Sequence, residues 1–211
     1  HRVFFQLRDA RERGAQLTEA DFPKNNPFTD PSDIRQLYYE GTDLLGTWLG
    51  VSLGRQQISY GDQRVFGPGQ WGNTGRCAWD AALVNVKTAR FSADVWVGRS
   101  VRNRPDRWPN ASVSEPAVGV AYVRALGLPF RADMFYVRKE DRSGRTAGER
   151  GAGDLRSNSF GFQAEGSRGR LDYALTGVVQ HGMWGQDKIR AAGASGTLGI
   201  RLKWPWQPRL R

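Results

Sequence analysis

The amino-acid sequence predicts an all-β fold: an antiparallel, up-and-down transmembrane β-barrel with about ten strands, which we expect to be part of a larger barrel. First, apolar and polar residues alternate with a period of two over segments of roughly 9–11 residues, the length of a membrane-crossing strand. Second, the connections between these segments alternate between short and long. Third, the longest charge-free runs, 44–54 and 173–186, are too short and too glycine-interrupted for a membrane helix.

Composition agrees with a β-rich globular chain. Of the 211 residues, 39% are hydrophobic, 11% are aromatic and 26 are glycine. Aromatic residues favour strands, and glycine favours turns. This aromatic content also excludes a disordered chain. The only cysteine is Cys77 and the only histidines are His1 and His181, so we expect no disulfide, no metal site and no cofactor.

The charge balance indicates an anionic partner. Lysine and arginine number 31 against 21 acidic residues, which gives a formal net charge of +10. Such an excess suits nucleic acid, an anionic lipid surface, or an acidic polymer or solute.

Period-two alternation predicts each strand in turn. In 91–98 the apolar residues Phe91, Val95 and Val97 fall on one face, and Asp94 falls on the other. Segments 130–137, 170–180 and 192–203 alternate in the same way. The expected strands are 2–8, 34–41, 47–58, 79–88, 90–99, 117–125, 129–138, 157–165, 169–181 and 191–203.

The connections follow the rhythm of outer-membrane barrels, which have tight turns at one end and long loops at the other. The short connections are 41–46, 88–89, 126–128 and 166–168, and the long ones are 9–33, 59–78, 100–116 and 139–156. The link 182–190 lies on the long side although it is brief. We expect the long connections, which are rich in Gly, Pro and Arg, to be irregular, solvated loops.

Charge is segregated to one face of the predicted strands. A lysine or arginine facing lipid at the bilayer midplane costs about 2–4 kcal/mol, so this segregation fits a barrel with a wet interior. A soluble β-sandwich with its apolar face inward is the alternative that alternation alone leaves open. The polar-face residues are Gln6, Arg8, Gln36, Glu40, Lys87, Asp94, Arg131, Asp133, Asp172, Arg201 and Lys203.

One segment, 54–80, carries a long ordered motif. It reads Gly54-Arg55-Gln56, Tyr60-Gly61-Asp62-Gln63-Arg64, Gly67, Trp71, Asn73-Thr74-Gly75-Arg76 and Asp80. This motif resembles that of the alginate export family of bacterial outer-membrane β-barrels. The resemblance implies a large barrel of eighteen strands, and outer-membrane barrels usually end on an aromatic residue. With about ten strands and no such residue, we expect this chain to be an internal piece of a longer protein or a truncated member, forming one barrel domain or segment over 1–211.

The resemblance implies a channel rather than an enzyme. It would pass an anionic substrate, an alginate-like polyuronate or a small anion, through an arginine-rich lumen in the bacterial outer membrane. Outer-membrane lipid and periplasmic export proteins would be its partners, with no nucleic acid. Arginine suits this role because it pairs with carboxylates through two hydrogen bonds.

Several residues are expected to bind or orient the substrate. Asp62 and Asp80 would pair with arginines of the motif and orient them. The alternative is that Arg55, Arg64, Arg76 and these two aspartates only hold the loop in place by ion pairs. The substrate-binding candidates are Arg55, Arg64, Arg76, Lys87, Arg131, Arg170, Arg201 and Lys203.

A second function is left open by the residues themselves. A soluble, basic β-domain could bind nucleic acid or another polyanion through arginine and aromatic stacking. The aromatic residues, however, fall mainly on the uncharged face. We find no compact set of acid and base residues that would support an enzyme.

Overall fold

The computed structural model of the chain describes residues 1–14, 16, 19–22, 25–46, 48–61, 63, 65–67, 78–202, 204 and 209–210. Within them, two single-turn 3-10 helices, η1 (Glu19–Asp21) and η2 (Leu44–Gly46), accompany the strands. The strands are β1 (Arg2–Ala10), β2 (Asp30–Gly41), β3 (Leu49–Gln56), β4 (Trp79–Lys87), β5 (Phe91–Ser100), β6 (Ala117–Ala125), β7 (Arg131–Gly148), β8 (Gly151–Arg168), β9 (Leu171–Trp184), β10 (Asp187–Arg201) and β11 (Arg209–Leu210).

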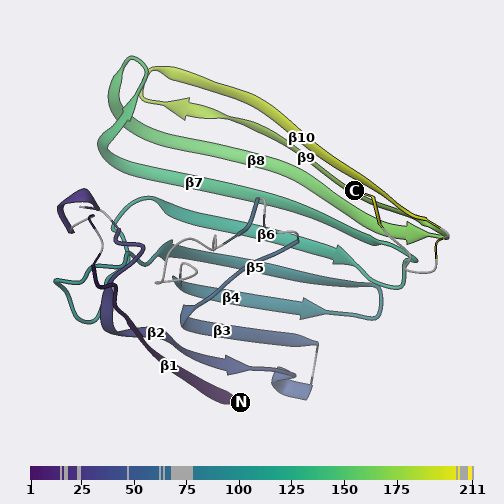
Figure 1. Ribbon diagram of the computed structural model, residues 1–211, viewed down its shortest axis with the longest axis horizontal. Helices are drawn as coiled ribbons and strands as arrows, with labels where there is room; N and C mark the ends of the chain where they lie inside the picture. Colours follow the sequence, from purple (N-terminus) through teal and green to yellow (C-terminus); the bar gives the residue numbers. More distant parts are fainter. Residues whose placement is uncertain are drawn as a thin grey trace. The chain divides into compact units, whose positions relative to one another are not determined.

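The strands form an antiparallel meander in which each strand hydrogen-bonds to the next in sequence, from β1 to β11 (Figure 1). The all-β fold and the ten expected strands are confirmed. The described strands do not close into a barrel, because β1 and β11 are the two ends of this order. In the described part of the chain, no helix is long and apolar enough to cross a membrane.

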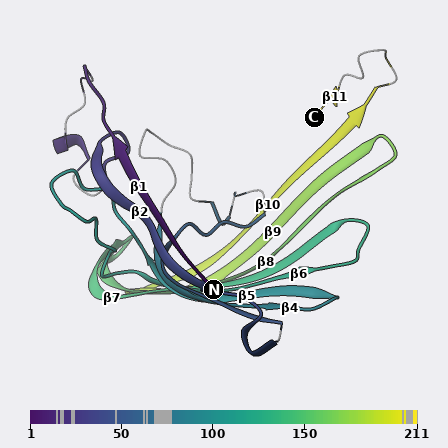
Figure 2. The same ribbon diagram turned by 90° about the horizontal axis from the view of Figure 1, so that it is seen from below.

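The chain divides into two compact units. One comprises His1–Val84 with Trp96–Ala117, and the other comprises Asn85–Val95 with Val118–Arg211. In the first unit, β1 pairs with β2 and β2 pairs with β3. In the second unit, β7, β8, β9 and β10 lie side by side as long ribbons (Figure 1 and Figure 2).

Strands β7 and β8, with 18 residues each, are much longer than the sequence predicted, whereas β9 and β10 are only slightly longer. Segments 139–156 and 182–190, expected to be loops, are mostly paired strand. The expectation was wrong because this extension is held by polar residues, which give no apolar signal. Glu140 lies directly across from Arg156, and the two form an ion pair with 3.6 Å between the charged atoms.

A bulge near the tip of the β7–β8 hairpin is organised by one carboxylate. Asp141 pairs with Leu155, whereas Thr146 pairs with Gly153, so four residues of β7 lie opposite one residue of β8 and form a bulge. Asp141 accepts hydrogen bonds from the Ser143 amide, at 2.8 Å, and from the Thr146 hydroxyl. These bonds replace the ladder contacts that the bulge interrupts.

The two faces of the sheet differ in chemistry, and the distribution is the reverse of that in a soluble sandwich. Large apolar side chains point outward and stay exposed, such as Val3 at 71% and Leu175 at 49%. The buried side chains include many polar ones, such as Asp133 at 1%, together with Gln163 and Asp172. The apolar face therefore has no protein cover among the described residues.

We predict that Asp141→Ala will loosen the hairpin tip. Loss of its two hydrogen bonds leaves the bulge without organisation, so amide hydrogen exchange across 142–153 should rise at least tenfold, while β9 remains protected. Asp154→Ala, an exposed aspartate on the partner strand, is the control. Equal exchange in the two variants would contradict this role for Asp141.

Candidate functional site

The Gly54-Arg55-Gln56 triplet of the motif forms a clamp between strands. Arg55 in β3 donates from Nε and Nη2 to the two oxygens of Asp80 in β4, at 2.8 and 3.1 Å. It also donates to the backbone oxygens of Asn110, at 2.7 Å, and Ile34, at 3.3 Å. One guanidinium thus joins β2, β3, β4 and the segment 101–116.

Gly54 and Gln56 complete the clamp around Arg55. Gly54 has a φ of +122°, and a Cβ atom there would lie 2.4 Å from the Leu37 carbonyl oxygen, so only glycine fits. The buried Gln56 accepts from the Ser52 hydroxyl at 2.8 Å and donates to the Ala81 oxygen at 3.3 Å. This part of the motif therefore has a structural task.

A second set of contacts anchors the segment 101–116. Asn110 is almost completely buried, and its side-chain nitrogen donates to both carboxylate oxygens of Asp30, at 2.9 and 2.8 Å. Its amide donates to Asp33 at 2.9 Å, and its side-chain oxygen accepts from the Arg104 amide at 2.7 Å. All of these polar groups of Asn110 are therefore satisfied without water.

Arg8 ties β1 to the same anchor. It forms an ion pair with Asp30 and donates to the side chain of Asn103 at 3.0 Å. Asn103 in turn accepts through its backbone oxygen from Asn26 at 2.9 Å. Arg8 and Arg55 are thus both held by carboxylate and amide oxygens.

Between these anchors, the segment reaches solvent. Arg104 and Asp106 form an exposed ion pair at 2.6 Å, and hydrogen bonding to Arg104 lowers the pKa of the Asp106 carboxyl. The interaction is solvent-screened and adds little to stability.

Sequence reasoning missed the anchors formed by Arg8, Asp30, Asn103 and Asn110 as a group. Asp30 and Asn110 are eighty positions apart in the chain, and no periodicity connects them. The Pro-Asn step at 109–110 was the only local signal, and it marks a turn without identifying its partner.

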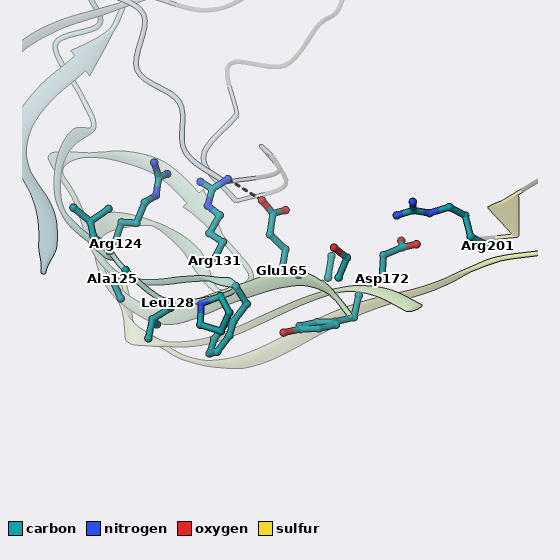
Figure 3. A pocket seen from close by; sticks show the side chains of 15 residues that line it. Arg124, Ala125, Leu128, Arg131, Glu165, Asp172 and Arg201 are labelled. Carbon is teal, nitrogen blue, oxygen red and sulfur yellow. Dashed lines mark hydrogen bonds and ion pairs between the residues drawn. The ribbon is translucent and has the colours of Figure 1, made fainter. Parts of the chain in front are cut away.

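The second unit contains a charged pocket of about 660 Å³ beside the short turn 126–129 (Figure 3). Arg131 donates to Asp133 at 2.7 Å and to Glu165 at 3.1 Å. Arg124 also donates to Asp133, at 3.1 Å, and Tyr122 donates to it at 2.5 Å. The buried Asp133 is thereby surrounded by donors.

Arg201 lines the same pocket from β10. Figure 3 shows its guanidinium on the same side of the strands as Asp172, Glu165 and Arg131. Its side chain is exposed and makes no ion pair with another described residue. The pocket therefore combines neutralised arginines with one available cation.

The remaining predicted residues are dispersed. Lys87, at the end of β4, and Arg170, in the β8–β9 turn, are exposed. The structure brings together Arg131 and Arg201 in one pocket, and Arg55 with Asp80 in the clamp. Asp62, Arg64, Arg76 and Lys203 lie outside the described residues. Among the side chains that are described, no group of three or more metal-ligating residues occurs.

The family model described as alginate export matches residues 1–211. No curated protein matches the chain.

We predict that Asn110→Ala will lower the free energy of unfolding by about 2–4 kcal/mol. The substitution removes the side-chain amide that donates hydrogen bonds to the buried carboxylate of Asp30. Denaturant unfolding in detergent micelles, followed by tryptophan fluorescence, measures the change. Arg107→Ala, an exposed side chain in the same segment, should change the value by less than about 0.5 kcal/mol. Similar losses in both variants would refute the anchoring role.

Proposed function

Because the chain belongs to the alginate export family, whose model spans all 211 residues, we propose that it forms the wall of an outer-membrane β-barrel channel for an anionic polyuronate. Family members are transport proteins rather than enzymes. The proposal places one face of the strands against lipid and the other against the transported polymer.

The exposed apolar face is the observation that carries this proposal. On β9 it comprises Leu171, Leu175 and Val179, with Ile200 and Leu198 beside them on β10. From Leu171 to Val179 the strand rises about 26 Å at roughly 3.3 Å per residue, which corresponds to a height of about 20 Å at the roughly 40° tilt of barrel strands. An apolar band about 25 Å tall is typical of barrels embedded in an outer membrane.

The polar face supports transport of an anion without tight binding. A channel must attract its cargo and also release it. Arg124 and Arg131 already share Asp133 and Glu165, so their attraction for a uronate carboxylate is reduced. Arg201, beside them, makes no ion pair with another described residue. Such a mixture raises the local anion concentration while keeping each contact weak.

The contacts of the clamp separate Arg55 and Asp80 from the other predicted site residues. We propose that Arg55 and Asp80 hold the segment 101–116 in position, because the Arg55 donors are satisfied by protein oxygens. The residues kept as substrate-binding candidates are Arg64, Arg76, Lys87, Arg131, Arg170, Arg201 and Lys203, and Asp62 is kept as an orienting candidate.

We predict that Leu175→Arg will destabilise the membrane-inserted chain by about 2–4 kcal/mol, because it places a cation on the lipid-facing surface near the middle of the apolar band. Folding into phosphatidylcholine vesicles, followed by denaturant titration, measures this loss. Thr176→Arg, one residue along on the polar face, is the matched control and should cost less than about 1 kcal/mol. Equal effects, or a wild-type chain that stays out of vesicles, would overturn the proposed orientation.

We predict that the refolded chain will conduct anions in a planar bilayer under a KCl gradient, and that added polymannuronate will block the current. Arg201→Gln should shift the reversal potential toward cation selectivity, because it removes the available cation of the pocket. Arg107→Gln is the control. An absence of conductance steps from an inserted chain would overturn channel formation by this chain, and unchanged selectivity would remove Arg201 from the pathway.

A further inference from the structure

A cluster of cations lies on the apolar side of β7 to β10, where a lipid-facing surface would not be expected to carry charge. We define this outer cation cluster as Arg138, Arg142, Arg156, Lys188 and Arg190, all of them exposed. Strand register places Arg156, Lys188 and Arg190 on the same face as Phe160, Val179 and Ala192. The outer cation cluster is thus separate from the pocket of Arg131 and Arg201, which is on the opposite face.

The outer cation cluster contains far more positive than negative charge. Among the described residues, Glu140 is the carboxylate that pairs with this cluster, with charged-atom distances of 2.7 Å to Arg142, 3.4 Å to Arg138 and 3.6 Å to Arg156. This single anion holds three guanidiniums close together. It cannot neutralise them, and Lys188 and Arg190 add two further charges from β10.

An aromatic row borders the outer cation cluster on the side of the apolar band. Tyr136 and Phe160 have ring centroids 4.7 Å apart, and Phe160 stacks on His181 at 5.8 Å. The Tyr136 hydroxyl donates to Asn158 at 2.6 Å. Rings with an apolar body and a polar tip mark the boundary between hydrocarbon and headgroups in barrels. The cluster is therefore at headgroup level.

Below this row the apolar face contains a groove of about 630 Å³. Ala192 and Ala194 form its low part, because small side chains leave the surface depressed, and the Phe162 ring lies against Gly177. The flanking side chains Met134, at 70% exposed, and Phe162, at 51%, rise beside it. A groove lined in this way accommodates a flexible hydrocarbon chain.

We propose that β7 to β10 bind a phosphate-bearing membrane lipid, with its headgroup phosphates on the outer cation cluster and an acyl chain in the groove. Guanidiniums pair with phosphate through two hydrogen bonds, and cations near a membrane surface strengthen anionic lipid binding. A polyuronate does not fit this face, because it has no apolar part for the groove. This inference rests on the proposed membrane channel.

The test uses the full chain folded into phosphatidylcholine vesicles, with or without a diphosphorylated acylated glycolipid of the lipid A type. Detergent extraction followed by native mass spectrometry measures the lipid retained. We expect R138Q/R156Q/R190Q to reduce retention about tenfold or more. K139Q/R145Q/R150Q removes the same number of charges from β7 and the β7–β8 turn, outside the cluster, and should retain the lipid.

A second variant tests the groove separately. Ala194→Phe should fill it and reduce retention while leaving all five cations in place. Inorganic phosphate alone should not displace the lipid, because the acyl chain contributes to binding. Equal retention by both triple variants, no effect of Ala194→Phe, or displacement by free phosphate would overturn this site. Flotation with vesicles is scored first, because a chain that fails to float refutes the channel proposal instead.

Discussion

The rest of the structure depends on the pleat of the β-strand, which sends successive side chains to opposite faces. In this chain the pleat separates two chemistries. Leu171, Leu175 and Val179 project from one face of β9, while Asp172 and Thr176 project from the other. Because backbone groups pair between strands, the sheet can present apolar side chains outward without exposing its polar backbone. The apolar face and the polar face of the sheet both follow from this single geometric rule.

Charge on the polar face is organised by shared carboxylates. Asp133 accepts from Arg124, Arg131 and Tyr122, and Asp30 accepts from Arg8 and Asn110. Buried carboxylates of this kind hold their cations at defined positions, which a flexible surface arginine would not keep. The Arg55–Asp80 clamp works in the same way but also contacts backbone oxygens, so it positions a whole segment.

The sequence allowed the strands to be predicted because alternation is a local signal. Segment 169–181 was predicted as a strand from its own residues, and Arg131 and Asp133 were placed on one face by counting. The extension of β7 and β8 was missed because Glu140 and Arg156 stabilise it through a cross-strand contact between polar residues. The pairing of Asp80 with an arginine of the motif, here Arg55, could be predicted because both residues belong to the same motif. The Asn110 anchor was not, because its partners Asp30 and Asp33 are remote in the chain.

The fastening of the segment 101–116 has a practical consequence. Its anchors are at Asn103 and Asn110. Arg55 donates a hydrogen bond to the backbone oxygen of Asn110 rather than to its side chain. Residues 105–107, which lie between these anchors, carry none of the buried contacts. They form a natural insertion point for a peptide epitope or a fluorophore, because a graft there leaves both fastenings intact.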